Sequence, residues 1–200
     1  MTLFSLAAAP LTPAEKHKAI AQINASVGKI QSLNGTFTQT KNLKMLNDKM
    51  VSHGRMMFKA PGKLRWEYTD PYTYLFIFNG TKVYVGNAKK KDVIDTNSNK
   101  IFREVARIMM STVTGKALTS KDEFTVDIAD GGKTWNVTLV PKKKEMKGMF
   151  SKILLVFNKA DSMISEVNLF EKNGDKTNIR MQGMAKNKAV NETHFTIPAK

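Results

Sequence analysis

The stretch FTVDIADGGKTWNVTLV, from Phe124 to Val140, decides the fold that we expect for this chain. Apolar and polar residues alternate on both sides of Asp130-Gly131-Gly132, a turn sequence that separates two strands. The same alternation runs through most of the sequence and predicts about eleven strands. The intervals between strands are short, so neighbours should pair antiparallel, because parallel pairs need long crossovers. Further turns are expected at Asn79-Gly80, Asn158 to Asp161 and Asn173-Gly174-Asp175.

Two segments have helical spacing instead. Thr12, Pro13 and Glu15 form a capping box with a proline at the first helical position, and they predict a helix that ends at Gly28 or at Asn34-Gly35. Its apolar stripe consists of Ile20, Ile23, Val27 and Ile30. A second helix fits residues 99–111, with an apolar side made of Ile101, Phe102, Val105, Ile108 and Met109.

The strands pose a covering problem. Each has one apolar face that must be kept from water, and two helices cannot cover a flat sheet of this size. The sheet should therefore curl, either closing on itself or wrapping around the helices. A curled sheet with an apolar interior is also a container. No linker or change in composition divides the chain, so we expect one domain over residues 10–200.

Composition limits the class of protein. With 42% hydrophobic and 24% charged residues, the chain is typical of a soluble globular protein. It has 32 Lys and Arg against 17 Asp and Glu, and the net charge of +15 favours a negatively charged partner or surface. Cysteine is absent, which excludes disulfides, thiolate metal sites and a cysteine nucleophile. No apolar stretch reaches the roughly 20 residues that span a bilayer.

The first nine residues are mostly apolar and end in small side chains, with Ala7 and Ala9 in the A-x-A arrangement of a secretory signal. A basic segment ahead of them is missing. Two interpretations stay open for residues 1–9: the remnant of a signal peptide, or a disordered N-terminus.

Motifs that would indicate catalysis are incomplete. Gly132-Lys133-Thr134 resembles the end of a P-loop, but Asp127 stands where the first glycine is required, so a hairpin turn is expected instead. The three histidines have no metal-ligand spacing, and no G-x-S-x-G motif is present. We therefore expect no catalytic residues, no metal site, no cofactor and no enzymatic activity.

Two lysine clusters, Lys89–Lys91 and Lys142–Lys144, lie where we expect loops. Such clusters usually form solvated tips, and the alternative is contact with an anionic membrane or an acidic partner. Nucleic acid is disfavoured, because aromatic residues do not alternate with the lysines. The aromatic residues gather instead between Trp66 and Phe78, and together with twelve methionines they favour an adaptable apolar cavity.

The order of the motifs resembles that of the LolA family, the periplasmic carriers of outer-membrane lipoproteins. The resemblance extends from about Thr12 to Pro198. Most specific are Phe37-Thr38-Gln39, then Gly54 to Pro61 with the pattern G-x-x-x-F-K-x-P, and Leu64-Arg65-Trp66. The supporting motifs are Asn79-Gly80 with Val83-Tyr84, Leu139 to Lys142, Ile153 to Asn158, and Asn187 ahead of Phe195 to Pro198.

The resemblance implies an incomplete, open antiparallel β-barrel whose concave face is covered by helices as a lid. It implies secretion into the periplasm of a Gram-negative bacterium through an N-terminal signal peptide. The implied cargo is acylated lipoprotein, received from an inner-membrane release complex and passed to an outer-membrane acceptor by a monomer that comes transiently close to membranes. The alternative is a lipid- or lipoprotein-sensing regulatory protein, or another hydrophobic-ligand binding protein, of the same fold.

Site residues follow from combining the resemblance with strand spacing. The predicted cargo cavity consists of Phe37, Leu64, Trp66 and Tyr68, the last three on one face of a strand. The predicted lid residues are Ile20, Ile23, Phe102, Val105 and Met109. The resemblance implies an Arg directly before the proline at position 61, which in many relatives ties the sheet to the lid, whereas this chain has Ala60. Lys59 and Arg65 are the nearest candidates for such a polar latch.

Overall fold

Strands form most of the computed structural model, which describes residues 10–80, 82–87, 89–97, 99, 109–110 and 116–197. Within these residues, eleven strands make one sheet in the order β6-β5-β4-β3-β2-β1-β11-β10-β9-β8-β7, and neighbouring strands are antiparallel. The strands are β1 (Ser32–Leu43), β2 (Asp48–Lys59), β3 (Lys63–Asp70), β4 (Tyr74–Asn79), β5 (Lys82–Gly86), β6 (Lys91–Asp95), β7 (Phe124–Asp130), β8 (Thr134–Pro141), β9 (Phe150–Asn158), β10 (Ile164–Glu171) and β11 (Lys176–Lys186). The predicted strand number and antiparallel pairing are confirmed.

The predicted turns lie between the strands. Gly80, Gly132 and Gly174 have φ angles of 68°, 77° and 92°, in the left-handed region that glycine adopts at little cost. Gly132 joins β7 to β8, so the segment that resembled a P-loop is the hairpin turn that we expected.

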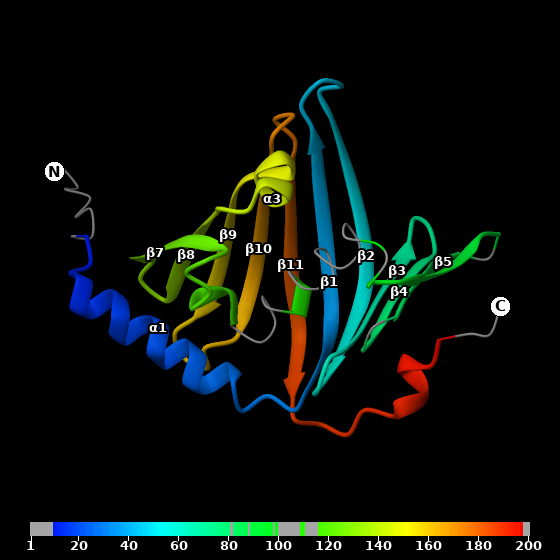
Figure 1. Cartoon of the computed structure of the whole chain (residues 1–200), viewed down its shortest axis with the longest axis horizontal. Helices are drawn as coiled ribbons and strands as arrows, with labels where there is room; N and C mark the ends of the chain where they lie inside the picture. Colours follow the sequence, from blue (N-terminus) through cyan, green and yellow to red (C-terminus); the bar gives the residue numbers. More distant parts are fainter. Residues whose placement is uncertain are drawn as a thin grey trace, which may run out of the picture.

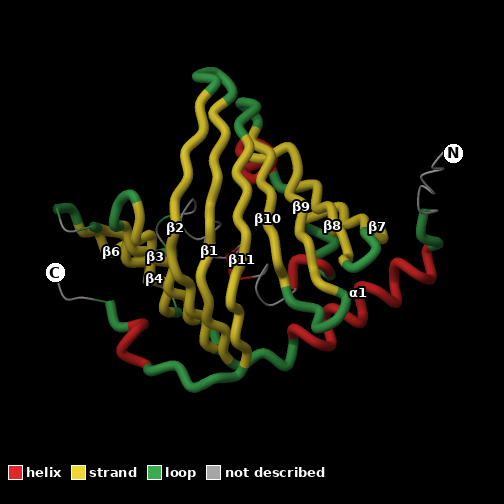
Figure 2. The backbone as a smooth tube through the Cα atoms, turned by 180° about the vertical axis from the view of Figure 1, so that it is seen from behind, coloured by secondary structure: helices red, strands yellow, loops and turns green. Residues whose placement is uncertain are grey.

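The sheet curls around one core and stays open. Val83 and Val85 near one edge belong to the same buried cluster as Phe124 and Ile128 at the other. The edge strands β6 and β7 do not pair with each other in the described sheet. Figure 1 looks onto the concave face and Figure 2 onto the opposite, convex face. The predicted single sheet, curled into an open barrel, is confirmed.

Helix α1 (Pro13–Val27) packs on the concave side, near β7 (Figure 1). Thr12 and Glu15 form the predicted capping box, and Gly28 is the C-terminal cap. Ala19, Ile23 and Val27 on the buried side join the core cluster of the sheet, and Lys16 Nζ lies 2.5 Å from Asp127 Oδ1 on β7.

The predicted second helix lies mostly outside the described residues, and the part left out includes Phe102 and Val105. Met109 and Met110 are helical, whereas Asn99 is not in a helix. Both methionines pack against the core cluster. No helix in the described part of the chain has the length and apolar character that crossing a bilayer would require.

A short helix, α3 (Lys144–Met149), was not expected and corrects our interpretation of one lysine cluster. Lys142 and Lys143 are in a loop as predicted, but Lys144 begins this helix. Similarly, Lys89 and Lys90 precede β6, but Lys91 is its first residue. Of the two methionines of α3, only Met146 is buried, and a single helical turn among lysines is too short to show a readable period.

The C-terminal segment lies on the other side of the sheet. After β11 the chain crosses below the strands and forms a 3-10 turn, η2 (Glu192–Phe195), beside β3 and β4 (Figure 1). Phe195 is fully buried there in a second cluster with Ile77 and Tyr84. The neighbours of Ile77 and Tyr84 along their strands, Phe76 and Val83, belong to the concave core, so this cluster occupies the convex face. A second 3-10 turn, η1 (Lys116–Leu118), lies near α1 and contributes to the main core.

Candidate apolar binding pocket

A pocket of about 300 Å³ lies on the concave face, between β3 and β4 on one side and β9, β10 and β11 on the other. Its wall consists of Gln39, Leu64, Trp66, Tyr68, Tyr74, Phe76, Met109, Phe150, Ile153, Val167, Leu169, Ile179 and Met181. These side chains are apolar or aromatic except Gln39. The pocket therefore offers a ligand hydrophobic surface and little that could polarise a bond.

Strand β3 supplies three predicted cavity residues because of its alternation. Leu64, Trp66 and Tyr68 are two residues apart, so they point to the same face, and all three line the pocket. Leu64 is fully buried and Trp66 nearly so. Across the ladder, Trp66 pairs with Phe76 and Tyr68 pairs with Tyr74, which extends the aromatic wall onto β4.

Phe37, the fourth predicted cavity residue, supports the wall from behind rather than lining the pocket. Its ring stacks on Trp66 with centroids 4.2 Å apart, and it meets Tyr68 edge-on at 5.3 Å. Phe37 pairs in register with Gly54 on β2. A Cβ atom on Gly54 would collide with the Phe37 ring and with the Glu67 carbonyl oxygen, so the glycine makes room for the ring.

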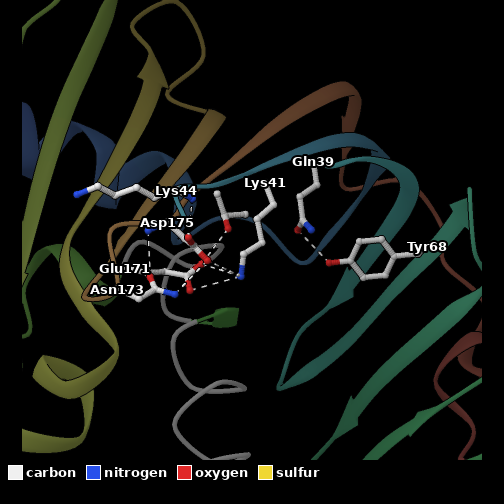
Figure 3. Close-up of polar contacts among 8 residues, drawn as sticks. Gln39, Lys41, Lys44, Tyr68, Glu171, Asn173 and Asp175 are labelled. Carbon is white, nitrogen blue, oxygen red and sulfur yellow. Dashed lines mark hydrogen bonds and ion pairs between the residues drawn. The ribbon is translucent and has the colours of Figure 1, made fainter. Parts of the chain in front are cut away.

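Gln39 and Tyr68 form the polar contact of the pocket wall. The Tyr68 hydroxyl donates to Gln39 Oε1 at 2.9 Å (Figure 3). Burial raises the pKa of Tyr68 above its ordinary value, so the hydroxyl stays protonated as a donor. This hydrogen bond satisfies the acceptor of Gln39 within a wall that is otherwise largely apolar.

The described lid residues lie at different depths. Ile23 is fully buried in the core and Ile20 is half-buried against it. Met109 lines the pocket directly. The roles of all these residues in taking up cargo stay predictions.

The predicted latch residues contact a different part of the chain from the one that we expected. Lys59 Nζ lies 2.7 Å from Glu192 Oε1, and Arg65 Nη1 donates to the His194 carbonyl oxygen at 3.2 Å. Lys63 joins the same carboxylate at 2.5 Å. Because Leu64 faces the pocket, Lys63 and Arg65 face the convex side, and these cations fasten the C-terminal segment there.

A polar cluster ties strand ends together at the upper end of the sheet in Figure 1. Lys41 Nζ lies 3.2 Å from Glu171 Oε1, and Asp175 Oδ1 accepts from the Lys44 backbone N–H at 2.9 Å (Figure 3). Asn173 Nδ2 donates to Asp175 Oδ2 at 3.0 Å. The carboxylates of this cluster are occupied by structural contacts. Among the described residues, no group of three His, Asp or Glu side chains could hold a metal ion.

Sequence reasoning missed the far wall of the pocket. Ile179 and Met181 are two residues apart and therefore share a face, but this spacing does not tell that β9 to β11 curl to face β3. Gln39 carries a signal, because it stands two residues after Phe37 and therefore shares its face.

Comparison with known proteins points to one family. The sequence profile described as "Outer membrane lipoprotein carrier protein LolA" matches residues 28–198. An outer-membrane lipoprotein carrier protein of Chromobacterium violaceum is 26% identical over 198 residues, 98% of this chain and 90% of that protein. One from Pseudomonas aeruginosa strain UCBPP-PA14 is 24% identical over 188 residues, 94% of this chain and 87% of that protein.

Solved structures share the fold. An uncharacterized conserved protein from Thermus thermophilus superposes with a TM-score of 0.56 at 8% identity, over 91% of this chain and 94% of that one. A chain of the Pseudomonas aeruginosa MucA/MucB complex superposes with a TM-score of 0.51 at 8% identity, over 90% of this chain and 60% of that one. At such low identity, these similarities concern the fold alone.

Proposed function

The chain belongs to the LolA family of outer-membrane lipoprotein carrier proteins, and from this premise we propose that it carries acylated lipoproteins with their acyl chains held in the apolar pocket. The observation that carries the proposal is the pocket wall, in which Leu64, Trp66 and their neighbours surround an almost wholly apolar space. Each methylene transferred from water into such a space contributes about 0.8 kcal/mol. Acyl chains with dozens of methylenes therefore need a carrier of this kind to cross water.

The proposal includes a route. The protein would take its cargo from a release complex in the inner membrane, cross the periplasm as a monomer and hand the cargo to an acceptor in the outer membrane. This transport needs no covalent step, only two states of the cover over the pocket with a small difference in free energy. Met109, one of the predicted lid residues, contributes directly to the pocket wall, which supports a cover at this place.

Trp66 provides the test. The chain has two tryptophans, so Trp135→Phe leaves Trp66 as the sole indole, inside the pocket wall. Titration with a synthetic triacylated lipopeptide should change the intensity and wavelength of Trp66 emission with saturation. The same peptide without acyl chains is the matched control and should leave the emission unchanged. Equal responses to both peptides, or none to the lipopeptide, would overturn the proposal.

A further inference from the structure

The hairpin between β1 and β2 ends in an apolar tip that the pocket does not explain. Met45 is 90% exposed and Leu46 is 71% exposed, and Met50 and Val51 behind them are also exposed. Turn positions usually carry small or polar residues, so two large apolar side chains at a turn are unusual. β3 pairs with β2 only from His53 onward, so the tip extends beyond its neighbour into solvent (Figure 1).

Positive charge surrounds this tip. Lys44 and Lys49 flank the two apolar residues and are both exposed. Two other segments reach the same end of the sheet: Asp175 binds the backbone of Lys44, and the Lys172 backbone N–H donates to the Met149 carbonyl oxygen at the end of α3. Together, residues 41–49, 144–149 and 171–176 contain seven lysines and four carboxylates, an excess of three positive charges.

The apolar pocket reaches the same end. A groove of about 400 Å³ lies between the end of α3 and the β10–β11 turn, where Met149 and Lys172 contribute to its wall. Phe150 and Leu169 line both this groove and the pocket. A hydrophobic molecule that left the pocket along these two residues would emerge beside the cationic end.

We propose that the β1–β2 tip docks on a bilayer rich in anionic phospholipid, with Met45 and Leu46 in the interface and the surrounding lysines over the headgroups. Apolar side chains next to lysines are the combination that binds such a surface, because burial and charge attraction act together. The lysine excess makes an anionic bilayer the better fit than a neutral one. This inference goes beyond the proposed carrier function, since it concerns the protein without cargo.

Flotation of cargo-free protein with lipid vesicles tests the proposal. The protein should float with vesicles of phosphatidylglycerol and phosphatidylcholine, bind pure phosphatidylcholine far less, and dissociate as salt rises. Met45→Ser/Leu46→Ser should weaken binding roughly tenfold or more. Met45→Leu/Leu46→Met preserves the apolar surface and should bind like the parent.

Charge reversal gives a second matched pair. Lys44→Glu/Lys49→Glu should abolish most of the binding. Lys29→Glu/Lys133→Glu changes the net charge equally, but Lys29 follows α1 and Lys133 lies in the β7–β8 turn, at the opposite end of the sheet, so binding should persist. Equal losses in the two variants would mean that net charge alone acts, and would overturn the proposal.

Two further outcomes would also overturn it. One is that the parent does not bind anionic vesicles. The other is that the Ser variant binds vesicles normally but loses a protein partner, which would make the tip a protein-docking element. Leu64→Glu, a change in the pocket, should leave vesicle binding intact even if lipopeptide binding fails, so the two proposals fail separately.

Discussion

Gly54 determines how closely two strands can bring their aromatic side chains together. Its missing side chain gives Phe37 the space to lie flat on Trp66, and Trp66 in turn forms the pocket wall. The backbone of Gly54 is not in the left-handed region, so its conformation does not require glycine. What requires glycine is the space that a Cβ atom would take from the Phe37 ring. A residue outside the pocket lining therefore sets the position of a ring in the pocket wall.

Gly54→Ala should destabilise the protein by about 1–3 kcal/mol, because the new methyl group collides with the Phe37 ring and with backbone on β3. Trp66 emission should also shift in the folded protein, since the ring stacked on it must move. Gly148→Ala is the control, because a Cβ there meets open space. Denaturant unfolding of both variants checks this, and equal stability of the two would contradict the steric account.

Leu64 and Leu155 distinguish pocket wall from sealed core. Both are fully buried, but only Leu64 lines the pocket. Leu64→Glu should keep a cooperative thermal transition and weaken lipopeptide binding, because its carboxyl group enters a space that must open to admit cargo. Leu155→Glu should lower the free energy of unfolding by about 4 kcal/mol or more, which is enough to unfold a marginally stable protein. If both variants collapse alike, or if Leu64→Glu binds lipopeptide normally, Leu64 is not part of the site.

At the scale of elements, the C-terminal segment behaves as a strap over the convex face. The Phe195 side chain of this segment packs against the sheet. Lys59 on β2, and Lys63 and Arg65 on β3, bind the segment through ion pairs and a hydrogen bond. Hydrogen bonds from Lys59, which has the larger effect, and from Lys63 lower the pKa of the Glu192 carboxyl below its ordinary value of 4.5. A lowered folded-state pKa means that the ion pairs stabilise the folded protein above pH 4.5, and that this stabilisation is lost as the pH falls through the folded value.

Acidification below pH 4.5 should therefore loosen residues 190–197 before the sheet unfolds. Hydrogen exchange of a peptide covering these residues, corrected for intrinsic rates, should increase on going to about pH 3. Glu192→Gln should exchange rapidly at both pH values, because the charge is gone throughout. Glu145→Gln removes an exposed carboxylate on α3 and should behave like the parent. A Glu192→Gln protein with the parent's pH profile would refute this assignment.

Elements with a strong local signal were predictable, and their arrangement in space was not. The capping box at Thr12 and the period-two runs specify α1 and the strands through local chemistry, and Leu64, Trp66 and Tyr68 share a face for the same reason. The far wall on β9 to β11 depends on curvature, which arises from packing over the whole sheet. The partners of Lys59 and Arg65 escaped prediction because the C-terminal segment returns over more than 100 residues to meet them.

For the whole molecule, the size of the pocket implies movement. Its volume of about 300 Å³ is at the lower end of the roughly 300–1,000 Å³ typical of small-ligand sites, whereas a lipoprotein anchor has several long acyl chains. The proposed carrier function therefore requires the covering elements and the sheet to separate when cargo enters. α1 is the described element best placed to move, since it contacts the sheet mainly at the edge strand β7.

Fixing α1 to β7 should prevent uptake. Because the chain has no cysteine, Lys16→Cys/Asp127→Cys introduces two unique thiols where an ion pair now bridges α1 and the sheet. Loss of that exposed pair costs at most about 1 kcal/mol, so the reduced variant should still fold and bind lipopeptide. A short bismaleimide containing a cleavable disulfide should then lower uptake by about tenfold or more, and reductant should restore it. Lys159→Cys/Asp130→Cys is the matched control, because its 2.6 Å ion pair joins the β9–β10 turn to the last residue of β7 within the sheet, and the same cross-link there should leave uptake unchanged. If the α1 cross-link has no more effect than this control, cargo enters without displacing α1, and the opening must lie at the end of the pocket lined by Phe150 and Leu169.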